Sequence, residues 1–150
     1  MRILLQRVSR AHVTIEEKEK AAIGKGLLIF IGIEGADTKE DADQLCGKIT
    51  RMRLFPDSKG VMNLSIQEVA GELLVISQFT LHASTKKGNR PSYYKAARPE
   101  VAIPLYDYFL EKLWNTADQP VKSGVFGAHM KVELTNDGPV TIWMDSKDRE

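Results

Sequence analysis

The residue types that could carry out hydrolysis gather in one short segment, Ser77-Gln78-Phe79-Thr80-Leu81, which is followed by His82. A hydroxyl group is an effective nucleophile only with a base beside it. We expect residues 72–81 to form a strand, and alternate side chains of a strand share a face, so Thr80 and His82 could form such a pair. Thr80 is equally ordinary as a β-branched strand residue, and the sequence leaves both interpretations open.

A second unusual segment is Asn136-Asp137-Gly138-Pro139. Asn-Asp-Gly between two alternating runs, 131–135 and 140–144, predicts the turn of a β-hairpin. The proline does not fit this interpretation, because it cannot donate to a strand ladder and is avoided at inner strand positions. The segment is therefore either a device at a sheet edge or a shaped piece of backbone that exposes carbonyl groups.

Other catalytic patterns are missing from the sequence, which has no G-x-S-x-G elbow, no H-E-x-x-H helix and no Walker loop. His12, His82 and His129 are scattered without the spacing of a zinc site. We therefore expect no metal ion and no cofactor. The single cysteine, Cys46, excludes an intramolecular disulfide, fits a reducing cytoplasm and is expected to be a small buried hydrophobic residue.

The composition bounds the protein class. The chain has 150 residues, 43% hydrophobic and 27% charged, which is typical of one globular domain. No apolar run is long enough to span a bilayer, and the N-terminus does not resemble a signal peptide, so we expect a cytoplasmic protein without membrane contact. A net charge of +1 argues against a general binder of DNA or RNA. The one local basic candidate is Lys86, Lys87 and Arg90, which by itself also fits a solvated loop.

The elements that must position these residues form a strand-rich order with few helices. Turn residues and apolar periodicity predict strands at 1–8, 11–15, 26–33 and 72–81, a helix from the capping box at Thr38, a helix at 104–115 and the hairpin 131–144. This order favours an α+β fold with a curved, mainly antiparallel, barrel-like sheet and helices packed on one side.

The segments 77–81 (SQFTL) and 136–141 (NDGPVT) resemble the two signature motifs of the D-aminoacyl-tRNA deacylases. Further segments resemble the same family in the same order: 6–11, 26–28, 62–65, 71–75, 87–92 and 124–128. The resemblance covers residues 1–145 and implies the D-aminoacyl-tRNA deacylase fold in a single domain, 1–150. Residues 146–150 lie outside it and are expected to form a disordered tail.

The resemblance also implies an activity and an assembly. It implies hydrolysis of the ester of D-aminoacyl-tRNA by a homodimer with two active sites at the subunit interface. The Gly138-Pro139 dipeptide is then a cis peptide that reaches into the partner's site and is tethered by Arg7. His82 and His129 depart from the residues that many relatives carry, without removing any motif.

The resemblance places the pocket residues and the tRNA contacts as well. Phe79, Met130 and Phe126 are expected to bind the substrate near its adenosine and aminoacyl groups. The basic loop, Lys86, Lys87 and Arg90, becomes a candidate contact for the tRNA phosphates.

The mechanism implied by the resemblance uses the substrate's own ribose hydroxyl and backbone groups, which agrees with the missing catalytic base. Thr80 is expected to position the ester, supported by Gln78 and Ser77, and a nucleophilic Thr80 is the alternative. Three other functions stay open: a small esterase using Thr80 and His82, a non-catalytic tRNA-binding dimer, and an editing domain of the kind found in threonyl-tRNA synthetases.

Overall fold

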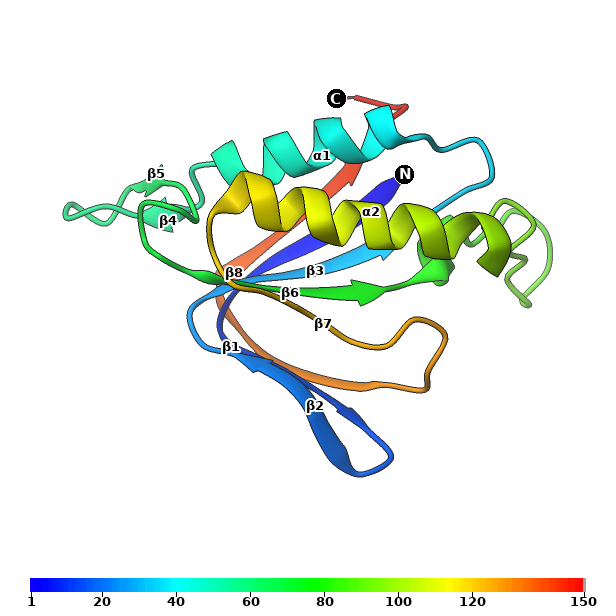
Figure 1. Ribbon diagram of the computed structural model, residues 1–150, viewed down its shortest axis with the longest axis horizontal. Helices are drawn as coiled ribbons and strands as arrows, with labels where there is room; N and C mark the ends of the chain where they lie inside the picture. The colour runs from blue at the N-terminus through cyan, green and yellow to red at the C-terminus, as the bar shows by residue number, and fades with distance from the viewer. Residues whose placement is uncertain (150) are drawn as a thin grey trace.

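The computed structural model describes residues 1–149 and has a curved six-stranded sheet covered on one face by two helices, with β4 and β5 forming a separate two-stranded sheet (Figure 1). The elements are β1 (Arg2–Ile15), β2 (Lys18–Ile23), β3 (Gly26–Gly32), α1 (Lys39–Arg51), β4 (Phe55–Pro56), β5 (Met62–Leu64), β6 (Glu72–Ser77), the 3-10 turn η1 (Phe79–His82), α2 (Pro99–Ala117), β7 (Val121–Ser123) and β8 (Lys131–Asp145). The predicted α+β architecture is confirmed.

Strand β1 organises the sheet because it pairs with three other strands. Its first half is antiparallel to β3, its second half is antiparallel to β2, and β8 runs antiparallel along both halves. The order β2-β1-β3-β6-β7 then curls into a barrel-like form, in which the Nζ atom of Lys122 on β7 donates to the carbonyl of Ala22 on β2 at 2.6 Å. The two strands predicted at 1–8 and 11–15 are thus one bent strand. The sheet is also mixed, because β3, β6 and β7 run parallel to one another.

The two helices pack together over one face of the sheet and bury the main core. Helix α1 begins at the predicted capping box, where the backbone N–H of Thr38 donates to the Asp41 carboxylate at 2.8 Å. Helix α2 begins at Pro99 rather than at the predicted Pro104. The helix begins before Pro104 because the turn that precedes this proline contributes the buried Ala102 to the core. This packing outweighs the hydrogen bond that the proline removes.

The predicted hairpin at 131–144 is wrong. Both of its arms belong to the single strand β8, and both pair with β1, from Thr14 opposite Lys131 to Arg2 opposite Asp145. The Asn-Asp-Gly-Pro segment forms a bulge in this strand, because Gln6 pairs with Thr141 whereas Val8 pairs with Asn136. A long neighbouring strand therefore satisfies both arms, which local turn preferences cannot reveal.

The end of the chain is partly ordered. Ser146 is buried, and its backbone N–H donates to the carbonyl of Met1 at 2.9 Å, so the expected disorder does not begin at Ser146. Glu150 lies outside the described residues. Cys46 is buried as predicted, and burial raises the pKa of its thiol to about 12. Within residues 1–149, no helix combines the length and apolarity needed to cross a membrane.

Candidate functional site

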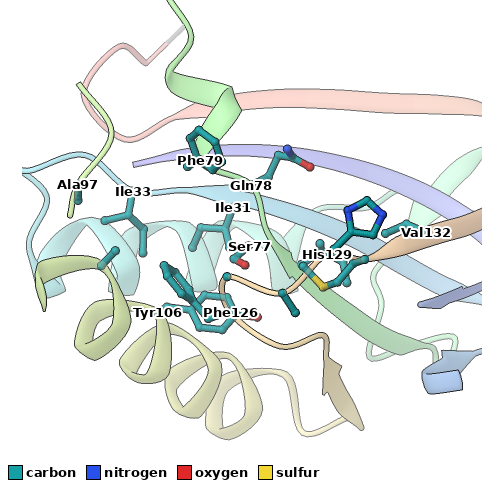
Figure 2. Close-up of a pocket in the computed structure, with 15 residues that line it drawn as sticks. Ile31, Ile33, Ser77, Gln78, Phe79, Ala97, Tyr106, Phe126, His129 and Val132 are labelled. Carbon is teal, nitrogen blue, oxygen red and sulfur yellow. The ribbon is translucent and has the colours of Figure 1, made fainter. Parts of the chain in front are cut away.

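A cavity of about 260 Å³ opens between the ends of β3 and β6, helix α2 and the segment before β8 (Figure 2). Five of the predicted site residues line it: Ser77, Gln78, Phe79, Phe126 and Met130. The other lining residues are mostly apolar and come from the sheet, from α2 and from the approach to both: Ile31, Ile33, Ile76, Ala97, Ala102, Tyr106, Gly127, Ala128, His129 and Val132. The structure thus brings residues from distant parts of the chain into one apolar chamber with a polar rim.

The rim is formed where β6 ends. The parallel pairing of β6 with β3 stops at Ser77, and the N–H of Gln78 makes a last bond to the carbonyl of Ile31 at 2.7 Å. The chain then turns into η1, so the strand predicted to run to residue 81 ends at residue 77. Phe79 and Thr80 open this turn, and the first N–H groups of a helical turn have no acceptor within it. These two N–H groups are therefore available to a ligand.

Gly32 on β3 allows η1 to lie directly on the sheet. A Cβ atom at this position would be 2.9 Å from the Cβ of Leu81 and 3.0 Å from the carbonyl oxygen of Gln78. Both distances are shorter than ordinary van der Waals contacts. The missing side chain of Gly32 therefore fixes the height of η1 above β3, a role that the sequence analysis missed.

Gln78 and Thr80 form a small polar unit at the rim. The Nε2 atom of Gln78 donates to the Thr80 hydroxyl, so that oxygen is held as an acceptor and its own proton is free to donate elsewhere. Thr80 is half-buried beside the cavity but does not line it. The arrangement suits a group that positions a ligand, because nothing in it removes the hydroxyl proton.

The predicted pairing of Thr80 with His82 on one strand face is wrong, because both residues lie in η1. The side chain of His82 is 2% exposed, and its two ring nitrogens have no hydrogen-bond partner among residues 1–149. Burial lowers the pKa of this imidazole below its usual value. Burial and the lowered pKa both favour the neutral imidazole, so His82 is placed to pack against its neighbours rather than to act as a base, which argues against the small-esterase alternative.

Aromatic rings shape both the inside and the mouth of the cavity. Inside, the rings of Tyr106 and Phe126 lie 5.6 Å apart, and burial raises the pKa of Tyr106 to about 12. At the mouth, Phe79 is 56% exposed and meets Tyr93 edge-to-face at 5.0 Å. Met130 fills space left by Gly124, whose Cβ would lie 2.4 Å from the Met130 sulfur. Tyr93 and Gly124 are further site residues that the sequence analysis missed.

The second motif lies elsewhere on the chain, in the bulge of β8 opposite Arg7. The Arg7 side chain is almost fully buried, its Nε atom donates to the carbonyl of Asp137 at 2.7 Å, and its Nη1 atom donates to the carbonyl of Leu54. Asn136 holds the other end of the bulge, since its Oδ1 accepts from the N–H of Val140 at 2.8 Å. The expected tether by Arg7 is therefore present in the structure.

The dipeptide at the tip of the bulge is exposed. The Gly138-Pro139 bond is cis, Gly138 has a φ of +151°, and both residues are exposed to solvent. Neither residue lines the cavity of the same chain. One chain thus presents a cavity and, separately, a rigidly held and outward-facing Gly-Pro segment.

Residues 4–145 match the family described as D-Tyr-tRNA(Tyr) deacylase. The chain belongs to this family. Its relatives include the D-aminoacyl-tRNA deacylase of Phocaeicola vulgatus, which is 62% identical over 150 residues, with 100% of each chain covered. The solved structure of a c-Myc DNA unwinding element binding protein is 38% identical, covers 97% of this chain and 98% of its own, and has a TM-score of 0.90.

A probable eukaryotic D-amino acid tRNA deacylase has a TM-score of 0.82, with 95% of this chain and 97% of that chain covered. At 19% identity, it supports the fold alone. Both solved structures share the architecture of the deacylase family, with a mixed, nearly closed sheet and two helices. The fold expected from the two motifs is therefore confirmed.

The remaining candidate residues of the sequence analysis are dispersed. Lys86, Lys87 and Arg90 are exposed in a loop whose ends are joined by backbone bonds between Ser84 and Ser92. The three histidines do not converge, and no group of His, Cys, Asp or Glu side chains within residues 1–149 is arranged to hold a metal ion. His129 is the one histidine that lines the cavity.

Proposed function

We propose that the protein hydrolyses the ester of D-aminoacyl-tRNA and releases the free D-amino acid and the tRNA. The observation that carries the proposal is the apolar cavity whose rim is formed by Ser77, Gln78 and Phe79, beside the free N–H groups of η1. An aminoacyl ester such as the D-tyrosyl ester fits such a site, because an apolar chamber can hold an aromatic group and the ester carbonyl needs hydrogen-bond donors. The tRNA itself is charged in the cytoplasm, where we place the protein.

The reaction requires a site that stabilises the negative charge developing on the ester oxygen. The N–H groups of Phe79 and Thr80 are the donors that we assign to this oxygen, and the Thr80 hydroxyl, held by Gln78, positions the ester. We assign the role of base to no side chain, neither to His82, which is buried and unpaired, nor to His129 on the cavity wall. The 2′- or 3′-hydroxyl of the terminal ribose that is not esterified then helps to activate the attacking water.

The site is completed by a second copy of the chain. The Gly138-Pro139 segment is exposed and lies outside its own cavity, so it is free to enter the cavity of a partner. The sheet face away from the helices offers apolar surface for this contact. Leu4 of β1 pairs with Phe30 of β3 on one side and with Trp143 of β8 on the other, and the Trp143 side chain is 50% exposed. A homodimer that buries this face would bring each Gly-Pro segment to the other chain's cavity.

Selection between D and L substrates follows from sterics in this arrangement. Glycine has no Cβ, so the backbone at Gly138 approaches the substrate's α-carbon closely. The side chain of an L-amino acid would collide with this backbone, whereas a D-amino acid presents only a hydrogen there. Glycine presents a hydrogen on both sides, so exclusion by sterics alone leaves glycyl-tRNA as a substrate, including tRNA-Ala mischarged with glycine.

Ester loss from matched D-tyrosyl-, L-tyrosyl- and glycyl-tRNA tests the proposal. We expect hydrolysis of the D-tyrosyl and glycyl esters and protection of the L-tyrosyl ester. Equal rates for the two tyrosyl esters, or no hydrolysis at all, would refute the proposed activity and favour a non-catalytic tRNA-binding dimer. Hydrolysis of D-tyrosyl-tRNA with glycyl-tRNA fully intact would keep the activity but refute purely steric selection.

A further inference from the structure

The surface beside the cavity mouth has a charge pattern that the proposed reaction does not require. No Asp or Glu occurs between Glu72 and Glu100. This stretch carries five of the chain's 21 Lys and Arg residues, although the net charge of the whole chain is only +1: Lys86, Lys87, Arg90, Lys95 and Arg98. All five are exposed. The loop between η1 and α2 therefore presents a local positive surface, and phosphate groups are the natural ligands of such a surface.

Two tyrosines lie within this basic loop and differ in their surroundings. Tyr93 packs edge-to-face on Phe79 at the cavity mouth. Tyr94 is 75% exposed, more than any other large hydrophobic side chain among the described residues. An aromatic ring held in solvent among cations matches the surfaces that bind single-stranded nucleic acid, where bases stack on aromatic rings and cations follow the backbone.

The backbone that carries Tyr94 is anchored on both sides. The N–H of Ala96 donates to the carbonyl of Tyr93 at 3.0 Å, and the N–H of Ala97 donates to the carbonyl of Ile33 at 2.9 Å. Ala97 itself lines the cavity (Figure 2), and the loop projects beyond the adjoining ends of β3 and β6 (Figure 1). The tyrosine is thus presented next to the entrance by a fixed turn, which lowers the entropic cost of binding.

We propose that Tyr94, together with Lys95 and Arg98, binds the unpaired nucleotides that precede the aminoacylated terminal nucleotide of the tRNA. One base stacks on the Tyr94 ring, and the two cations contact the neighbouring phosphates. The occupant is a single strand, because a duplex offers no open base face for stacking. This inference rests on the proposed function, and it makes the loop a second part of the substrate site that recognises RNA independently of the amino acid.

The first experiment compares a full substrate with a minimal one. The ratio of kcat/KM for D-tyrosyl-tRNA to kcat/KM for D-tyrosyl-adenosine is measured in the wild type and in Tyr94→Ala. Loss of one stacked base lowers this ratio roughly 5- to 100-fold. Tyr94→Phe keeps the ring and should retain the ratio, and Trp114→Ala removes an exposed ring at the far end of α2 as a control. A ratio unchanged in Tyr94→Ala overturns the inference.

The second experiment does not depend on catalysis. A labelled single-stranded RNA with the sequence of the tRNA 3′ end is titrated with each variant by fluorescence anisotropy. We expect weaker binding for Tyr94→Ala, and for Lys95→Ala a salt slope smaller by about 0.7 than that of the wild type. Lys59→Ala, an exposed cation in the turn between β4 and β5, is the charge control.

The outcomes of the two experiments separate the two proposals. RNA binding that depends on Tyr94 without any ester hydrolysis refutes the proposed function and keeps only the nucleotide contact at Tyr94, which is then no longer part of a deacylase substrate site. Hydrolysis of the ester together with RNA binding that neither Tyr94→Ala nor Lys95→Ala weakens supports the proposed function and overturns the inference. A DNA strand of the same sequence distinguishes the two nucleic acids, and tighter binding of the DNA than of the RNA also overturns the assignment to the tRNA end.

Discussion

The role of Gly32 gives the sharpest test of how the fold positions the site. Gly32→Ala adds a single methyl group between β3 and η1, at 2.9 Å from the Cβ of Leu81 and 3.0 Å from the carbonyl oxygen of Gln78. Carbon atoms pack best at about 3.5–4.0 Å, so η1 must retreat from the sheet by about 0.6–1 Å. The N–H groups of Phe79 and Thr80 move with it.

Two magnitudes follow from this displacement. Inserting a methyl group into a tightly packed contact costs about 1–3 kcal/mol of unfolding free energy, which a domain with a typical stability of about 5–15 kcal/mol survives. A misplacement of about 1 Å between catalytic groups and substrate costs on the order of 100-fold in rate. We therefore expect Gly32→Ala to remain folded and to lose about 100-fold in kcat/KM.

The assay combines urea unfolding with hydrolysis of D-tyrosyl-tRNA, and two glycines serve as matched controls. Gly35→Ala places its Cβ in open space and should change neither quantity. Gly71→Ala places its Cβ 2.5 Å from the Cδ1 atom of Ile66, away from the cavity, and should cost stability without the 100-fold loss of activity. Full activity in a destabilised Gly32→Ala would refute the idea that η1 positions the ester.

Three further outcomes are expected. Arg7→Lys keeps the charge but cannot reach both carbonyls that Arg7 joins, so it should lower the unfolding free energy by about 1.5–3 kcal/mol in urea titrations and weaken D/L selectivity. Because burial lowers the pKa of His82, the unfolded chain binds a proton at this imidazole at a higher pH than the folded protein does, so the stability should fall as the pH drops below about 6.5. Thermal unfolding at several pH values should show a flatter pH dependence for His82→Leu. The double variant Lys86→Ala with Lys87→Ala should reduce the salt slope of tRNA binding by roughly one unit per lost phosphate contact, and an unchanged slope would make this pair ordinary solvated surface.

The sequence predicted the fold class, because the strands and the first helix carry strong local signals. The sequence alone correctly predicts the buried strand β3 and the capping box at Thr38 that begins α1. The errors occur where a distant neighbour decides the structure. The bulge around Gly138 was predicted as a hairpin turn, since Asn-Asp-Gly favours such a turn and the sequence does not reveal that β1 pairs with both arms.

The site was predicted in part for the same physical reason. The motif at 77–81 identified the rim, and the resemblance supplied Phe126 and Met130, which the structure brings to the same cavity. Gly32 and Tyr93 carry no local signal of their roles. Their roles depend on tertiary contacts with η1: the glycine at the end of β3 leaves room for η1, and the tyrosine in the basic loop packs against Phe79.

The separation of the two motifs within one chain also explains why a search for a catalytic triad fails. The rim of the cavity offers backbone donors and the Gln78–Thr80 pair, and the segment at Gly138, which we propose to select the substrate, faces outward on another part of the sheet. Under the proposed dimer, neither half is sufficient: the cavity alone would accept either enantiomer, and the Gly-Pro segment alone binds nothing. Chemistry that relies on backbone geometry leaves few recognisable side chains, so such a site is found by its shape and by its assembly rather than by a set of acids and bases.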